Sequence, residues 1–134
     1  MSEYCKVKTQ IDSREHLLAA LRELGVEFEV GENLELTGYW GRHSSREMRS
    51  CEIAIRRENL PARPSNDIGY RKGPDGNYEL VIVDVDEYCL RDFVNQVAQR
   101  AARHKVLREA RRLGYAVLRQ KSAAGVLQLQ LRRM

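Results

Sequence analysis

Long apolar runs are missing from this sequence of 134 residues. Its buried-looking stretch Leu80–Val83 is far shorter than the roughly 20 residues of a transmembrane helix, and Met1–Lys6 lacks the basic start and apolar stretch of a signal peptide. The cysteines are few, Cys5, Cys51 and Cys89, and they form no closely spaced pair. This spacing excludes a recognisable zinc module and gives no sign of a disulfide scaffold. We therefore expect a cytoplasmic protein with no membrane partner.

Motifs that carry catalysis or bind phosphate are also missing. There is no Gly-x-Ser-x-Gly nucleophile elbow, and none of the cysteines has a local cysteine–histidine signature. The glycine-flanked segment Gly38–Gly41 is too short for a phosphate loop and lacks the Gly-Lys-Ser/Thr ending. These absences predict a protein that is not an enzyme and that uses no cofactor.

What the sequence does contain indicates a folded domain. Hydrophobic residues make up 43% and charged residues 31% of the chain, and no interdomain linker or repeat interrupts it. We predict a single α+β domain over residues 1–134. Its architecture is expected to be a mostly antiparallel sheet, with two helical segments packed on one face, and a C-terminal β-hairpin.

The predicted elements follow from alternation and helical spacing. Strands are expected at 4–11, at 26–30 with Val26, Phe28 and Val30 inward, near 34–37, and at 51–56. A hairpin joins 67–72 to 77–83 through the turn Gly73–Gly76. A helix is expected from the caps Asp12 and Ser13 to Gly25. A second helical stretch is expected from 87 to about 113, before a strand pair at 115–118 and 126–131 with a loop that contains Gly125.

The second helical stretch changes its apolar face partway along. Leu90, Phe93 and Val97 belong to one stripe, whereas the later apolar residues Val106, Ala110 and Leu113 fall nearly on the opposite side. Two explanations stay open. Either the helix breaks or bends near 102–105, so that two short helices each bury a face, or one helix packs its second half against a different surface.

Charge is distributed unevenly along the chain. Residues 88–134 have a net charge of +9, whereas residues 1–87 have a net charge of −5. Such asymmetry attracts an acidic partner, whether nucleic acid, an acidic protein surface or another part of the same domain. The basic helix and hairpin are therefore also compatible with nucleic-acid binding, although no aromatic residue lies among the arginines at 100–112 to stack on bases.

Two groups of residues are candidates for partner contact. Tyr39 and Trp40 lie between glycines in a predicted turn, and such aromatic residues are typical of protein interfaces. The alternative is that this loop packs over the sheet edge. The cations of the long helix, with its histidine, form the second group: Arg100, Arg103, His104 and Arg108. The edge of the C-terminal hairpin offers a further place for a partner strand.

Acidic residues near the end of the predicted strand 77–83 are the weak candidates for a metal site. Asp84 and Asp86 follow this strand, and with Asp67 they would supply the oxygen ligands that Mg²⁺ or Ca²⁺ prefers. His104 would complete a catalytic or metal-binding set if all four side chains converged. The simpler interpretation is that these acids cap the following helix, so we expect no metal.

The order of several short motifs resembles the hypothetical chloroplast reading frame thirty-five family, a domain of unknown function in red-algal plastids, cyanobacteria and scattered bacteria. The motifs that carry the resemblance are Lys8–Asp12, Leu24–Gly25, Gly38–Tyr39 with Gly41, Ile53, Asp67–Tyr70, Gly76 with Tyr78–Leu80, Asp84, Phe93–Gln99, His104–Val106, Gly114–Tyr115 and Leu129–Arg132. The resemblance implies a small α+β fold without a known activity. It also implies an association with AAA+ ATPases and with a second, very small protein.

Together these observations predict a non-enzymatic binding or adaptor protein. The expected partners are proteins, including an AAA+ ATPase and a small companion protein as the resemblance implies. Nucleic-acid binding through the basic C-terminal helix and hairpin is the alternative.

Overall fold

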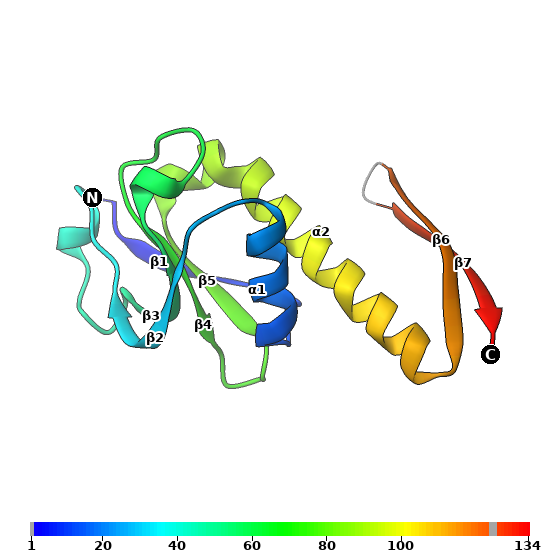
Figure 1. Cartoon of the computed structure of the whole chain (residues 1–134). Helices are drawn as coiled ribbons and strands as arrows, with labels where there is room; N and C mark the ends of the chain where they lie inside the picture. Colours follow the sequence, from blue (N-terminus) through cyan, green and yellow to red (C-terminus); the bar gives the residue numbers. More distant parts are fainter. Residues whose placement is uncertain (1, 124–125) are drawn as a thin grey trace.

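A computed structural model describes residues 2–123 and 126–134. The predicted α+β architecture is confirmed, with two α-helices, a five-stranded sheet and a two-stranded C-terminal hairpin in these residues (Figure 1). The predicted loop around Gly125 lies outside the described residues. Neither of the two helices combines the length and apolar character needed to cross a bilayer.

The five-stranded sheet has the order β1-β5-β4-β3-β2, and every neighbouring pair is antiparallel. Its strands are β1 (Tyr4–Lys8), β2 (Glu29–Glu35), β3 (Ser50–Ile55), β4 (Ile68–Lys72) and β5 (Tyr78–Val83). The last four strands follow one another as a meander, while β1 pairs with β5 and forms one edge. Between β4 and β5, Gly76 adopts a φ of 88°, as the predicted turn requires.

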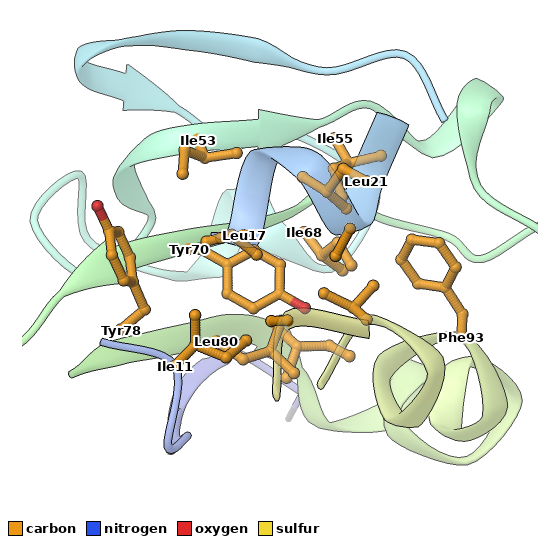
Figure 2. Close-up of a cluster of buried hydrophobic side chains, with 14 of the residues drawn as sticks. Ile11, Leu17, Leu21, Ile53, Ile55, Ile68, Tyr70, Tyr78, Leu80 and Phe93 are labelled. Atoms are coloured by element: carbon orange, nitrogen blue, oxygen red, sulfur yellow. The ribbon is translucent and has the colours of Figure 1, made fainter. Parts of the chain in front are cut away.

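Both helices, α1 (Arg14–Glu23) and α2 (Glu87–Arg112), pack on the same face of the sheet, as predicted. Between them and the strands lies the main apolar core, which includes Leu21, Ile68, Tyr70 and Phe93 (Figure 2). The largest of these side chains are almost completely removed from solvent. Burial of this apolar surface is the main force that holds the helices on the sheet.

A smaller apolar cluster covers the opposite face of the sheet. The excursion between β2 and β3 folds back over this face, since the Leu36 N–H donates to the Arg49 carbonyl at 2.8 Å. Leu36 is completely buried there against Tyr4, Cys51 and Val83. The sheet is therefore covered on both faces, by helices on one and by a loop on the other.

The strand predicted at 26–30 is wrong in its position. The Val26 N–H donates to the Leu21 carbonyl, and Gly25, with a φ of 71°, donates to Arg22, which together form a Schellman motif at the end of α1. Val26 and Phe28 thus pack against the core from the helix exit. β2 begins only at Glu29, and Val30 is 40% exposed rather than inward. A bulge with Asn33 at a φ of 53° then carries β2 to Glu35. Of the strand predicted near 34–37, Leu34 and Glu35 therefore belong to β2, and Leu36 and Thr37 lie beyond its end.

The helix α2 does not break at 102–105 but is continuous over 26 residues. Its first half buries Leu90, Phe93 and Val97 against the main core. Its second half buries Ala110 and Leu107, whereas Val106 and Leu113, which were predicted on this second face, are 44% and 58% exposed. The second of the two explanations for the change of face therefore holds, because a second structural element packs on the far half of the helix.

That second element is the C-terminal hairpin, formed by β6 (Tyr115–Ala123) and β7 (Val126–Arg133). Gly114, with a φ of 87°, ends the helix as predicted and reverses the chain. β6 contacts α2, and the hairpin stands well away from the five-stranded sheet (Figure 1). The protein thus consists of a body, residues 2–101, and an arm made of the far half of α2 and the hairpin.

A substitution at Gly69 in β4 tests how closely the smaller apolar cluster is packed. A Cβ atom at this position would lie 2.5 Å from Cys51 Sγ and 2.9 Å from the Ile53 carbonyl oxygen. We predict that Gly69→Ala lowers the free energy of unfolding by about 1–3 kcal/mol through overpacking. The double variant Gly69→Ala with Cys51→Ala should lose less free energy of unfolding in urea than the sum of the losses of the two single variants, because the smaller side chain at position 51 makes room for the added Cβ. A fully additive pair would contradict this packing.

Candidate functional site

Asp67, one of the weak metal candidates, is a buried structural residue. Its Oδ2 accepts hydrogen bonds from the Arg56 guanidinium at 2.9 Å and from the backbone N–H of Thr37 at 2.9 Å, and its Oδ1 accepts from the Arg57 N–H at 2.9 Å. Its own carbonyl accepts from the Tyr4 hydroxyl at 2.7 Å. Both carboxylate oxygens are therefore engaged within the fold.

The neighbouring Asn66 joins two other parts of the body. Its Oδ1 accepts the N–H groups of Trp40 and Gly41 at 2.9 and 2.8 Å, and its Nδ2 donates to Asp86 Oδ2 at 3.0 Å. Asn66 is completely buried, and Asp86 is 3% exposed. Since buried polar groups are costly unless paired, this network fixes both the turn at Trp40 and the start of α2.

The acidic candidates are not gathered in one place. Asp86 faces inward to Ser65 and Asn66, whereas Asp84, two residues away, is exposed. His104 is bound to Glu23 instead. Within residues 2–123 and 126–134, no group of three His, Cys, Asp or Glu side chains has a geometry that could hold a metal ion.

The three cysteines are free thiols in unreactive surroundings. Burial raises the pKa of Cys51 to about 12, and burial is also the largest cause of the raised pKa values of Cys5 and Cys89. Because the thiolate is the nucleophile, a raised pKa makes each thiol less reactive near neutral pH.

The predicted binding cations of α2 are brought together, but against α1. Glu23 accepts contacts from Arg100 at 3.4 Å and Arg103 at 3.8 Å, and it is bound directly by His104. Burial alone would raise the pKa of Glu23, yet the hydrogen bond and charges of these three partners bring it below its ordinary value. This cluster holds the C-terminal end of α1 on the middle of α2.

Two further ion pairs extend this contact. Arg108 binds Glu15 at 2.8 Å, and Lys105 binds Asp12 at 2.8 Å. A large part of the basic charge of the helix is thus balanced by the acidic N-terminal part of the same chain. The sequence pattern suggested a charged surface for partners, but these side chains have partners inside the protein.

Tyr39 and Trp40 are close neighbours with different surroundings. Tyr39 is 56% exposed, with the Arg42 guanidinium 5.0 Å from its ring, and its ring meets that of Trp40 edge to face. Trp40 is half-buried and packs on the smaller apolar cluster. Tyr39 therefore stays available for contact, while Trp40 also stabilises the loop that covers the sheet.

The hairpin of the arm exposes several apolar side chains. Leu118, Val126 and Leu131 are 55%, 58% and 40% exposed, and the hairpin forms a sheet of two strands only. Residues 115–134 include four cations and no acidic residue: Arg119, Lys121, Arg132 and Arg133. This charge has no balancing acid within the hairpin itself.

Two hollows line the helix beside this arm. One, about 450 Å³, lies between β1 and α2, and the other, about 340 Å³, lies between α2 and Leu127 of β7. Of the lining residues, only Arg100 and Arg103 were candidates for partner contact from the sequence. The sequence feature that could have indicated these hollows is the change of apolar face along α2, because it leaves Val106 outside both buried faces of the helix.

The chain is an α+β protein with a helix-covered antiparallel sheet and a projecting hairpin. A family model described as "Protein of unknown function (DUF1257)" matches residues 20–129, and the chain belongs to this family. The matched region begins within α1 and ends within β7, so it includes most of the arm. No curated protein and no solved structure matches the chain.

The buried network predicts the effect of Asn66→Ala. This substitution leaves the N–H groups of Trp40 and Gly41 without their acceptor, and each unpaired buried group costs about 1–3 kcal/mol. We expect the free energy of unfolding in urea to fall by roughly 2–4 kcal/mol. Asn95→Ala, at an exposed position of α2, is the control and should change it by less than about 0.5 kcal/mol. Equal losses for the two variants would contradict the bridging role of Asn66.

The Glu23 cluster predicts a dependence of stability on pH. Because the pKa of Glu23 is lowered on folding, its contribution is present above the ordinary glutamate pKa of about 4.3 and is lost as the pH falls through the lowered value. The urea midpoint of Glu23→Gln should therefore lie below that of the wild type at pH 7 and approach it at pH 3. Glu32→Gln, on exposed β2, should show no such convergence; an equal gap for Glu23→Gln at both pH values would refute the proposed coupling.

Proposed function

We propose that the protein is a non-enzymatic adaptor that binds another protein through its C-terminal arm. The observation that supports this function most directly is the exposed hairpin β6–β7. A hairpin of two strands is marginally stable in water unless it packs on something else. Here it contacts α2, yet Leu118 and Val126 remain more than half exposed.

The hairpin also offers backbone groups for binding. Because it consists of two strands, each strand has an outer edge without a strand neighbour in the described residues. Exposed strand edges pair readily with strands of other chains, and proteins commonly use them for recognition. The family match reaches Leu129, which supports the view that the arm is part of the common domain.

We further propose that the partner belongs to an assembly with an AAA+ ATPase and a very small companion protein, in the cytoplasm. This step rests on the resemblance to the hypothetical chloroplast reading frame thirty-five family. The fold is consistent with an accessory subunit, because the buried Asn66, Asp67 and Asp86 serve structural purposes and the hairpin of the arm exposes apolar side chains.

Nucleic-acid binding is the second candidate, and one observation favours it. The four cations of the hairpin have no acidic neighbour within residues 115–134, and a two-stranded ribbon fits the major groove of DNA. The helix contributes less than its sequence suggests, because Arg100, Arg103 and Arg108 contact acids of α1.

Affinity purification of the tagged protein from nuclease-treated native lysate tests both candidates. We expect the wild type to recover an AAA+ subunit, and Leu118→Thr with Val126→Thr to recover at least about tenfold less, since a loss of about 1.4 kcal/mol corresponds to that factor. Val30→Thr, a similarly exposed apolar residue of β2, is the matched control and should recover as much as the wild type.

The alternative outcome is equally specific. Recovery of nucleic acid without nuclease treatment, decreasing steeply with salt and unaffected by the two threonine substitutions, would replace the adaptor proposal by nucleic-acid binding. Tyr39→Ser belongs in the same series, because Tyr39 is exposed and Trp40, although it loses the edge-to-face contact with Tyr39, still packs on the smaller apolar cluster.

A further inference from the structure

The hollow between β1 and α2 lies along a free edge of the main sheet. Its floor includes Val7 and Leu80, which face each other in the β1–β5 pair, and its wall includes Val94, Ala98 and Val106 of α2. The lining is therefore mostly apolar, and its volume of about 450 Å³ falls in the range of ordinary ligand sites.

The backbone of β1 leaves part of this edge unpaired. Glu3 and Thr9 bond to β5, so the odd residues of the strand face β5 and the even residues face outward. The outward N–H of Tyr4 is taken by Ser44 at 2.8 Å. The backbone groups of Lys6 and Lys8 remain at the open edge, next to the hollow.

This hollow continues toward the arm. The second hollow, lined by Leu127 of β7, shares Ala102 and Val106 with the first, so the two adjoin on the exposed side of α2. Since they share these two residues, we describe them as one groove, which extends from the β1 edge to Leu127 of β7.

The charges around this groove are mostly positive. Lys8, Lys105, Arg100 and Arg103 line it. Two acids balance part of this charge, because Lys105 is paired with Asp12 and both arginines contact Glu23. The hairpin at its far end adds four cations and no acid. An occupant with negative charge is favoured by this complementarity, and a second copy of the cationic hairpin is disfavoured.

We infer that the groove binds an extended, acidic segment of a partner protein, which adds to the sheet along Lys6–Lys8 of β1. Its apolar side chains would lie on Val7, Val94 and Ala98, and its carboxylates would face Lys8 and the hairpin cations. Such strand addition obtains affinity from backbone hydrogen bonds and specificity from alternate side chains. The inference rests on the adaptor function proposed above and names the chemistry of its partner.

The apolar lining favours a protein segment over nucleic acid. A phosphate backbone would gain little from Val94, Ala98 and Val106, whereas every second side chain of a peptide strand would be removed from water there. The opposite edge of the sheet, β2, is a poor site for an acidic strand because it contains Glu29, Glu32 and Glu35.

Selection of a phage-displayed library of random 12-residue peptides on the purified full chain tests this inference. We expect the enriched peptides to be acidic and to alternate apolar with polar residues. Fluorescence anisotropy of the best enriched peptide should then show at least about tenfold weaker binding to Ala98→Trp, which fills the groove at an exposed helix position. The matched control is Asp92→Trp, exposed on the same helix in a separate hollow beside Leu24 and Pro61, and it should bind as the wild type does.

The inference fails if no peptide is enriched, if the enriched peptides are basic, or if Ala98→Trp binds them as well as the wild type. It also fails if labelled DNA or RNA binds with the same sensitivity to Ala98→Trp and competes with the peptide. Failure of this inference can be distinguished from failure of the adaptor proposal. If only the groove is wrongly assigned, Ala98→Trp still recovers the protein partner, and this recovery still depends on Leu118 and Val126.

Discussion

The pair of adjacent buried residues Asn66 and Asp67 joins the parts of the body that strand pairing leaves separate. The Asp67 carboxylate accepts hydrogen bonds from Arg56 and from the backbone N–H of Thr37. Asn66 accepts one from the backbone N–H of Trp40 and donates one to the carboxylate of Asp86 at the start of α2. The loop between β3 and β4 thus holds the β2–β3 loop on one face of the sheet and the N-terminal end of α2 on the other. Since Asn66, Asp67 and Asp86 are buried, leaving one of them unpaired would cost about 1–3 kcal/mol, or more for a carboxylate.

Because its N-terminal end is held in this way, α2 determines where the hairpin at its other end lies. Its first half is held by the main core and its middle by the contacts of Glu23 with Arg100, Arg103 and His104. A continuous helix is stiff, so the hairpin at its end is presented at a defined place relative to β1. The ion pairs with α1 are best understood as positioning contacts, which explains why a basic helix lies on the more acidic part of the same chain.

Several parts of this fold were predictable from local chemistry. The caps of α1, the turn at Gly76 and the stop at Gly114 each follow from short-range rules, and each is found. The apolar face of α2 does change, but the second half buries Leu107 with Ala110 and leaves Val106 exposed. The strand predicted at 26–30 was wrong in position because a Schellman motif also places an apolar residue after glycine. Alternation of apolar and polar residues over five positions does not distinguish this motif from a short strand. The roles of Asn66 and Asp67 could not be inferred, since their partners lie up to 63 residues away. Of the candidate site, the sequence identified the hairpin edge, but it did not identify the groove, which exists only where β1 and α2 meet.

The charge asymmetry of the sequence has two structural components with different consequences. In the helix, Lys105 and Arg108 are matched by Asp12 and Glu15, so their charge contributes to the contact between α1 and α2. In the hairpin, the cations have no acid in their own segment. A net charge of +9 over residues 88–134 therefore overstates the field that a partner meets along the helix. The remaining positive charge is concentrated at the hairpin end of an apolar groove, and this combination suits an acidic protein segment better than a uniformly charged polymer.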